Sequence, residues 1–513
     1  MTITSTVSTN DDPNSNENKS KSSTGVKLGV TALAMINVAA VLSLRNFPQM
    51  ALEGWSMVFW YILFAVTFLI PVALVAAELA STWPKAGGIY AWVKEAYPKK
   101  GSFITIWCSW TNNIVYFPTV ASFIMITLAY TILQPTFGNN AVYMTIVMLA
   151  SMWILTFFNF TGMKNSTKLS TMGTLLGSLV PIGILIMITF IWLLNGHTSN
   201  MGDFTASALL PSNTGNLLQT FTLASSLVLI YAGMEMAGYH ARDTKNPRKD
   251  YPKAMFFAAA IICLVSIAGT WAVGSIVPID FLNSENGLNG GVIEAFSIAL
   301  DDMGVGWLLV PLGLMLTVGI LAQLSTWMIG PARGLAPAAY TGDLPPIFRK
   351  TNKNGAPIGV LIIQCAISSI FVMAYVIMTI LKIDGYWVLV AITSLINIIM
   401  YFFMFIAFVK LRKTQKDRTR PFKLPGGTAG MWILAIVSIG TLGFGFIFGL
   451  CPEDPTGYSA IEMAVYILGM LIGVIAIAIL PPYIIQNRLK KDSWLPTKEE
   501  LEEFEAGEIQ DDQ

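Results

Sequence analysis

The strongest indication of the architecture comes from Leu229-Ile-Tyr-Ala-Gly-Met-Glu-Met-Ala-Gly238. It ends an apolar segment long enough to cross a bilayer, yet it holds two glycines and the carboxylate of Glu235. Glycine lets a backbone leave helical geometry, and an ionisable side chain inside a membrane segment is a functional hypothesis by default. The stretch therefore predicts a helix that breaks part-way across the membrane.

A second stretch of the same kind lies nearer the N-terminus: Ile36-Asn-Val-Ala-Ala-Val-Leu-Ser-Leu-Arg-Asn-Phe-Pro48. Transporters often use discontinuous helices at the midplane of the membrane, where unwound backbone and half-helix ends bind substrates and ions. The two stretches fall in the first and sixth predicted spans, five helices apart. That spacing predicts two five-helix repeats of opposite orientation, followed by two further helices.

The composition identifies a membrane protein. Of the 513 residues, 54% are hydrophobic and 12% are charged, and the mean hydropathy is +0.62. Soluble domains carry about 25% charged residues. We expect an all-α membrane protein with twelve helices, each long enough to cross about 30 Å of hydrocarbon. The predicted spans are 28–52, 55–80, 101–133, 141–160, 167–194, 217–240, 254–278, 305–333, 358–382, 386–410, 430–450 and 460–485.

The distribution of Lys and Arg predicts the orientation. Connections that follow even-numbered spans are rich in cations, whereas Lys382 is the only clear cation in the odd-numbered connections. Both termini are therefore expected in the cytoplasm, with the chain in the cytoplasmic membrane. We expect a disordered tail over 1–26, a transporter domain over 27–485 and an acidic tail over 486–513.

Two smaller expectations concern the first tail and one external loop. The N-terminal tail lacks the apolar core of a cleavable signal peptide, so the first span is expected to direct insertion. Residues 279–304 form an acidic connection that we expect outside the cell, with a short surface helix over 291–303.

Other classes of function find little support in the sequence. It has no nucleotide-binding loop, metalloprotease motif or nucleophile elbow, and its four cysteines form no CxxC pair. We therefore expect no enzyme activity, no metal or other cofactor and no nucleic-acid partner. A membrane sensor would need a folded signalling domain, for which both predicted tails are short. Two matched broken helices favour alternating access over the continuous pore of a channel.

Two charges inside predicted spans have alternative interpretations. Glu235 is either a gating or coupling carboxylate beside a helix break, which we favour, or a carboxylate near water at the end of an ordinary helix. Arg45 is either a clamp for a substrate carboxylate, because guanidinium matches carboxylate geometry, or an interfacial anchor. Asn112 and Asn113 either contact substrate or bond across helices. Gln323 and Trp327 are similarly open.

Several motifs resemble known families. The loop after the second span and the sixth span with its following loop resemble those of the amino acid–polyamine–organocation superfamily. Two later motifs resemble the bacterial glutamate:GABA antiporter family more closely. The four motifs are Pro84-Lys-Ala-Gly-Gly-Ile-Tyr-Ala-Trp92, Gly233-Met-Glu with Asn246-Pro-Arg-Lys-Asp-Tyr-Pro252, Trp327-Met-Ile-Gly-Pro-Ala-Arg-Gly334, and Leu344-Pro-Pro-Ile-Phe-Arg-Lys-Thr-Asn-Lys-Asn-Gly-Ala-Pro357. The resemblance covers residues 27–485.

The resemblance implies a LeuT-like fold, with helices 1 and 6 broken, and exchange of an amino acid for a related amine or amino acid. It assigns gating or coupling to Glu235 and Trp327. The predicted substrate-binding residues are Val41, Leu42, Ser43, Arg45, Asn113, Tyr231, Ala232, Gly233 and Gln323. Gln323 and Arg45 depart from the glutamate:GABA pattern, where those positions look acidic and aromatic.

The sequence thus predicts a secondary amino-acid transporter without enzyme activity. We expect an antiporter that exchanges external glutamate or aspartate for an internal amine or related amino acid such as GABA. A proton-coupled importer on the same fold is the alternative, and a non-transporting sensor is the alternative of another class. The expected partners are amino acid and amine substrates and the lipid bilayer. We expect a monomer or homodimer, with functional coupling to an amino-acid decarboxylase as the resemblance suggests.

Overall fold

The computed structural model describes residues 28–85, 87–98, 101–211, 217–284, 286–382, 385–452 and 457–502. Within these ranges the chain is helical, and its one β-bridge pairs Leu28 with Thr244. The predicted N-terminal tail, 1–26, lies outside the described residues. The prediction of an all-α protein is confirmed.

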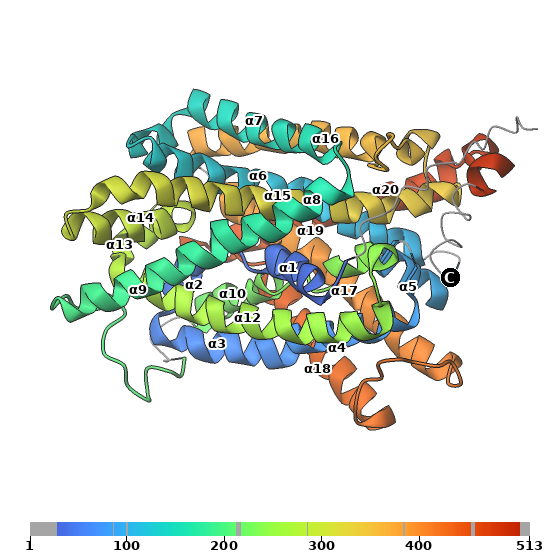
Figure 1. Cartoon of the computed structure of the whole chain (residues 1–513), viewed down its shortest axis with the longest axis horizontal. Coiled ribbons are helices and arrows are strands. Elements are labelled where there is room, and N and C mark those ends of the chain that lie inside the picture. The colour runs from blue at the N-terminus through green and yellow to red at the C-terminus, as the bar shows by residue number, and fades with distance from the viewer. Residues whose placement is uncertain are drawn as a thin grey trace, which may run out of the picture.

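Most long helices run along the longest axis of the molecule (Figure 1). The helices of the first half are α1 Val30–Val41, α2 Asn46–Ala51, α3 Met57–Phe64, α4 Ile70–Thr82, α5 Ile89–Ala96, α6 Gly101–Thr131, α7 Ala141–Asn159, α8 Met163–Thr174, α9 Val180–Leu194, α10 Leu217–Ser225 and α11 Leu227–Ile230. Those of the second half are α12 Pro247–Ile276, α13 Ile279–Leu282, α14 Gly287–Asp302, α15 Leu309–Tyr340, α16 Ile358–Ile380, α17 Gly385–Thr414, α18 Gly427–Phe448, α19 Ala460–Val474 and α20 Leu480–Ile484.

In the described part of the chain, ten helical stretches are long and apolar enough to cross a membrane. They agree with ten of the twelve predicted spans. The other two predicted spans, 28–52 and 217–240, contain the shorter apolar helices Val30–Val41 and Leu217–Ile230. Instead of one continuous helix, each of these two segments contains an irregular stretch, Leu42–Arg45 in the first and Tyr231–Glu235 in the second.

Helices α6, α15 and α17 form the centre of the molecule. Helix α6 is the most completely buried of the long spans, and its closest packing is against α15 and α17. By contrast, α18 and α19 expose most of their apolar side chains at the periphery. These three central helices therefore form the scaffold that holds the two irregular stretches in place.

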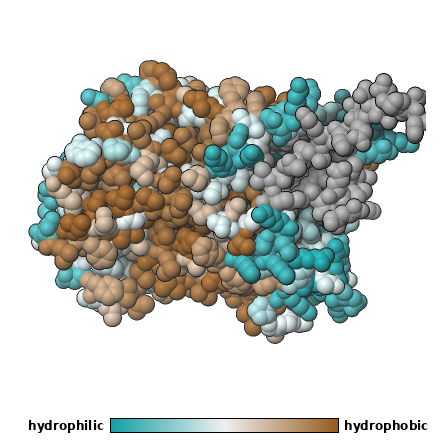
Figure 2. All heavy atoms as spheres, in the orientation of Figure 1, coloured by the Kyte–Doolittle hydropathy of each residue, from teal (hydrophilic) through white to brown (hydrophobic). Residues whose placement is uncertain are grey.

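Hydrophilic side chains gather at one end of the molecule, where α5 and α20 lie, while apolar side chains cover most of the remaining face (Figures 1 and 2).

The loop before α5 lies close to the stretch that follows Glu235. A Cβ added at Gly88 would lie 3.0 Å from the backbone nitrogen of Tyr239. Arg349 Nη1 donates to the carbonyl of Trp494 at 2.7 Å at this end. Through this hydrogen bond, the described part of the predicted acidic tail contacts the connection that follows α15.

The external helix predicted over 291–303 exists as α14, but it is not a surface helix. Most of its residues are buried against α2, α6 and α12. A Cβ at Gly291 would lie 2.8 Å from the Pro48 ring. The small residues on this helix allow it to close over α2, which the sequence pattern alone did not indicate.

Candidate functional site

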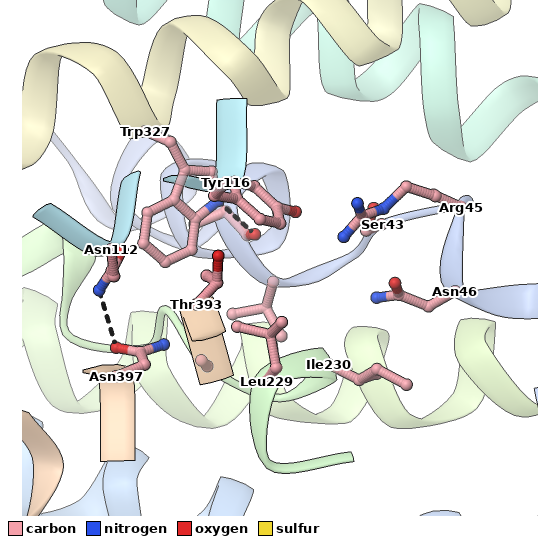
Figure 3. Close-up of a pocket in the computed structure, with 13 residues that line it drawn as sticks. Ser43, Arg45, Asn46, Asn112, Tyr116, Leu229, Ile230, Trp327, Thr393 and Asn397 are labelled. Carbon is pink, nitrogen blue, oxygen red and sulfur yellow. Dashed lines mark hydrogen bonds between the residues drawn. The ribbon is translucent and has the colours of Figure 1, made fainter. Parts of the chain in front are cut away.

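A buried pocket lies where the two irregular stretches meet α6, α15 and α17 (Figure 3). Only about 10 Å³ of it is open to the centre of a water molecule, which is room for roughly one water. In this conformation the pocket is therefore too small to hold an amino acid. The lining residues are Ala40, Val41, Ser43, Arg45, Asn46, Asn112, Tyr116, Leu229, Ile230, Ala232, Trp327, Thr393 and Asn397.

Side chains of α15 hold the end of α1. Because the helix stops at Val41, the carbonyl of Ala40 loses its usual partner four residues on. Trp327 Nε1 donates to this carbonyl at 2.9 Å, and Gln323 Nε2 does so at 3.4 Å. The Ser43 hydroxyl in turn donates to Gln323 Oε1 at 3.1 Å. Gln323 and Trp327, one helical turn apart on α15, thus supply hydrogen-bond partners to the end of α1 and to Ser43 of the irregular stretch.

A hydroxyl of α17 holds the second irregular stretch. Gly233 has φ of +121°, a conformation that L side chains rarely adopt. Its backbone N–H donates to the Tyr401 hydroxyl at 2.7 Å, and that hydroxyl donates to Glu235 Oε2 at 2.5 Å. Glu235 is 1% exposed, and its Oε1 has no hydrogen-bond partner among the described residues. The interpretation of Glu235 as a carboxylate beside water does not fit this burial.

Arg45 is the unusual charge of the pocket. Its side chain is 2% exposed, and its guanidinium carbon lies 4.8 Å from the Tyr116 ring centroid and 5.3 Å from that of Tyr386. Its Nε and Nη1 atoms have no hydrogen-bond partner in the described structure. Figure 3 shows Arg45 among the side chains that line the pocket. This placement does not fit an interfacial anchor, and a buried charge without a hydrogen-bonded counter-ion is costly even beside two aromatic rings.

The opposite side of the pocket is polar but uncharged (Figure 3). Asn112 Nδ2 donates to Asn397 Oδ1 at 3.1 Å, with Thr393 nearby on α17. Sequence reasoning left Thr393 and Asn397 out of the site. Their spacing of four residues in an apolar span places them on one helix face, which is the signal that would have found them.

The predicted site residues fall into two groups. Those that line the pocket are Val41, Ser43, Arg45, Ala232 and Trp327. Those that do not are Leu42, Asn113, Tyr231, Gly233, Glu235 and Gln323.

Two of the residues outside the lining have other partners. Asn113 Nδ2 donates to the carbonyl of Ser109 within α6, whereas its neighbour Asn112 lines the pocket. Tyr231 donates to the carbonyl of Tyr61 at 3.2 Å. In this conformation Tyr231, which was predicted to bind substrate, does not line the pocket. Among the described residues, no group of three or more His, Cys, Asp or Glu side chains is arranged to hold a metal ion.

A multi-pass helical bundle with a small buried pocket between two irregular stretches is the architecture expected of a membrane transporter. Comparison with known proteins gives the family. The profile of the amino acid permease family matches residues 28–479. The chain belongs to this family, within the amino acid–polyamine–organocation superfamily, as its motifs predicted.

Three relatives illustrate the range of the family. An uncharacterized transporter of Legionella pneumophila is 36% identical over 83% of this chain and 90% of its own length. A glutamate/gamma-aminobutyrate antiporter of Lactococcus lactis strain IL1403 is 26% identical over 94% of each chain. An aspartate/glutamate permease of Lactococcus lactis strain MG1363 is 27% identical over 74% of this chain and 78% of its own.

Proposed function

We propose that this protein is a secondary amino-acid antiporter that binds an acidic amino acid between two broken transmembrane helices. In this proposal 28–52 and 217–240 are the first and sixth of twelve spans, in a LeuT-like arrangement of two inverted five-helix repeats and two further helices. The observation that carries it is the buried pocket, which is lined by Ser43 and Arg45 of the first irregular stretch, by Ala232 of the second, and by helical residues that flank both stretches. Backbone freed from helical bonding at such a point can bind the α-amino and α-carboxylate groups.

Arg45 supports an acidic substrate. Its side chain lines the pocket, is buried, and has nitrogen atoms without a hydrogen-bond partner in the described structure. A second carboxylate, as in glutamate or aspartate, would supply a two-pronged partner for the guanidinium. The names of two relatives include glutamate, which supports the assignment of an acidic substrate.

Exchange for an internal amine or amino acid such as GABA extends the proposal. The glutamate/gamma-aminobutyrate antiporter of Lactococcus lactis, one of the relatives described above, is named for this exchange. Coupling to a decarboxylase that makes the exported amine stays a prediction, as does the choice between monomer and homodimer.

A proton-coupled importer on the same fold is the second candidate. Glu235 favours it, because a buried carboxylate with one oxygen unpartnered beside the pocket is a possible carrier of a proton. In this alternative the Glu235 carboxylate would bind a proton together with substrate outside and release it in the cytoplasm, and the empty transporter would return deprotonated, without an exchanged substrate.

The proposed topology places both termini in the cytoplasm of a bacterium. The hydrophilic end of the molecule (Figure 2) contains α5 and the C-terminal segment. Leu28, the first described residue, pairs with Thr244, which follows the stretch packed on the loop before α5. Cysteine labelling of residues 22 and 493 in whole cells, against an external position such as 204, would test this orientation.

Counterflow in proteoliposomes tests the transport mode. The purified protein is reconstituted with unlabelled glutamate, aspartate, GABA or a neutral amino acid inside, and uptake of labelled glutamate is followed. An antiporter shows uptake only with an internal substrate. Uptake into substrate-free vesicles driven by an inward proton gradient would instead establish the importer, and uptake of neutral or cationic amino acids only would contradict the acidic substrate.

A further inference from the structure

A groove lies on the outer surface of the bundle. It shares no lining residue with the transport pocket. It runs between α17 and α18, with Tyr97 at the end of α5 closing one side, and its volume is about 360 Å³. Its apolar walls include Val409 of α17 and Ile436 and Ile439 of α18. Ile436 is 64% exposed, so this wall faces the surroundings of the bundle rather than its core. In a membrane those surroundings are lipid.

Two lysines stand at one end of the groove. Lys410 Nζ lies 3.7 Å from the Tyr97 ring centroid, and Lys413 Nζ lies 4.5 Å from the Trp432 ring centroid. Because they are three residues apart on α17, both project from the same helix face. Among the described residues, neither ammonium has a carboxylate within ion-pair distance, whereas the neighbouring Arg412 is paired with Glu78. The lysine N–H donors therefore remain available to an anion.

A second surface groove provides an internal comparison. It is lined by Trp55, Met57, Val58, Phe190, Ile267, Ala268 and Trp271, with no charged residue among them. An acyl chain can occupy either groove, but only the groove between α17 and α18 offers cations at its mouth. Aromatic residues beside cations are typical of the level where acyl chains meet headgroups.

We propose that the groove between α17 and α18 binds an anionic glycerophospholipid. An acyl chain lies along Val409, Ile436 and Ile439, and the headgroup phosphate is held by Lys410 and Lys413. The site belongs to the leaflet that the proposed topology makes cytoplasmic, where anionic lipids are attracted to basic residues near the surface. Inorganic phosphate would satisfy the lysines without filling the apolar walls, and a zwitterionic lipid would fill the walls with less attraction to the lysines.

The test measures bound lipid on the full-length protein purified in detergent. Native mass spectrometry follows titrations with dioleoyl phosphatidylglycerol, dioleoyl phosphatidylcholine, dihexanoyl phosphatidylglycerol and inorganic phosphate. The variant K410Q/K413Q removes both headgroup contacts. The matched control K164Q/K168Q removes two exposed cations from α8. Because all four lysines lie at least partly at the surface, size-exclusion profiles should show that both variants remain folded.

The expected result is selective retention of long-chain phosphatidylglycerol by the wild type and by K164Q/K168Q. Affinity in K410Q/K413Q should fall by about tenfold or more, from two lysine–headgroup contacts. Equal binding of phosphatidylcholine, an equal loss in K164Q/K168Q, or no loss in K410Q/K413Q would overturn the proposal. Competition by inorganic phosphate or the dihexanoyl lipid at the same concentration as the dioleoyl lipid would show a simple anion site, which also overturns it.

Discussion

At the scale of single residues, two buried side chains govern the site. Arg45 places a guanidinium in the pocket with nitrogen atoms unpartnered in the described structure, and Tyr401 joins Gly233 to Glu235 through one hydroxyl. Sequence reasoning singled out Arg45 and Glu235, because a charge within an apolar span is conspicuous. It missed Tyr401, since a tyrosine in a membrane helix carries no such signal and its partners are distant in sequence.

Arg45→Lys tests the clamp. The substitution keeps the positive charge but loses the two-pronged contact. Apparent affinity for glutamate and aspartate should fall about tenfold or more, as expected for loss of a hydrogen bond to a charged group. Affinity for a neutral amino acid should change far less. Competition assays in proteoliposomes give both numbers, with R248K at the exposed start of α12 as the control. Unchanged affinity for acidic substrates would remove Arg45 from the binding site.

Glu235→Gln should insert and fold but lose most exchange, because the amide cannot bind or release a proton. Wild-type exchange by E235Q would show that the carboxylate has no role in turnover.

Tyr401→Phe removes the partner of both Gly233 and Glu235, and an unsatisfied buried polar group costs about 1–3 kcal/mol. This variant should therefore lower the thermal midpoint as well as exchange. Tyr483→Phe, at an exposed position of α20, is the control for Tyr401→Phe.

At the scale of elements, close approaches between helices are made by glycine. A Cβ at Gly177, in the π-helical turn Leu175–Leu179 before α9, would lie 2.2 Å from the backbone nitrogen of Gly319 in α15. Small residues at such crossings let membrane helices pack backbone to backbone. The glycines were visible in the sequence, but which of them face another helix depends on rotation about the helix axis, which an almost wholly apolar segment leaves undetermined.

Gly177→Ala should destabilise the fold by roughly 1–3 kcal/mol, because backbone atoms must move apart to accept a methyl group. Gly183→Ala, six residues further on, is the matched control, since nothing lies within 4 Å of its added Cβ. The control should be neutral or stabilise the helix by up to about 1 kcal/mol. Thermal unfolding in detergent compares the two variants. Equal midpoints would show that the crossing relaxes at little cost.

At the scale of the whole molecule, an ionic network joins segments far apart in sequence at the hydrophilic end. Glu78 of α4, 1% exposed, accepts from Arg412 Nε at 2.7 Å and from the backbone N–H of Leu424 at 2.8 Å, and Arg420 lies 3.2 Å away. Nearby Glu95 is more exposed. Partial burial opposes its charged form, but a hydrogen bond from Gln415 and the adjacent cations hold its pKa below the usual value.

Glu78→Gln should cost about 3–5 kcal/mol, because it leaves two arginines at a buried site without their counter-ion. Glu95→Gln provides the control and should cost under about 1 kcal/mol, as expected for a solvated pair. Chemical unfolding of the purified variants measures both. A small effect of E78Q would show that water replaces the carboxylate and that the network does not hold α4 to α17.

Hydropathy predicted the long helices well, because length and composition suffice for a membrane span. The partners within the site were not predictable in the same way. Gln323 and Trp327 were recognised as ambiguous polar groups, but their bonds to the carbonyl of Ala40 depend on the packing of α15 against α1. Asn112 replaced Asn113 in the pocket because adjacent residues on a helix point about 100° apart, and an apolar background does not fix which one faces inward.

The isolated guanidinium in the pocket also has an electrical consequence. Moving one elementary charge across a membrane potential of 100 mV involves about 2.3 kcal/mol. If Arg45 holds the substrate carboxylate, the loaded site carries no net charge from this pair, whereas an empty site that changes its access from one side to the other carries the arginine's charge through part of the field. Voltage would then act most strongly on the step in which the transporter returns unloaded. A carrier that returns with a second acidic molecule would keep the arginine paired in both directions, whereas one that returns with an amine lacking a carboxylate would carry the unpaired arginine through the field.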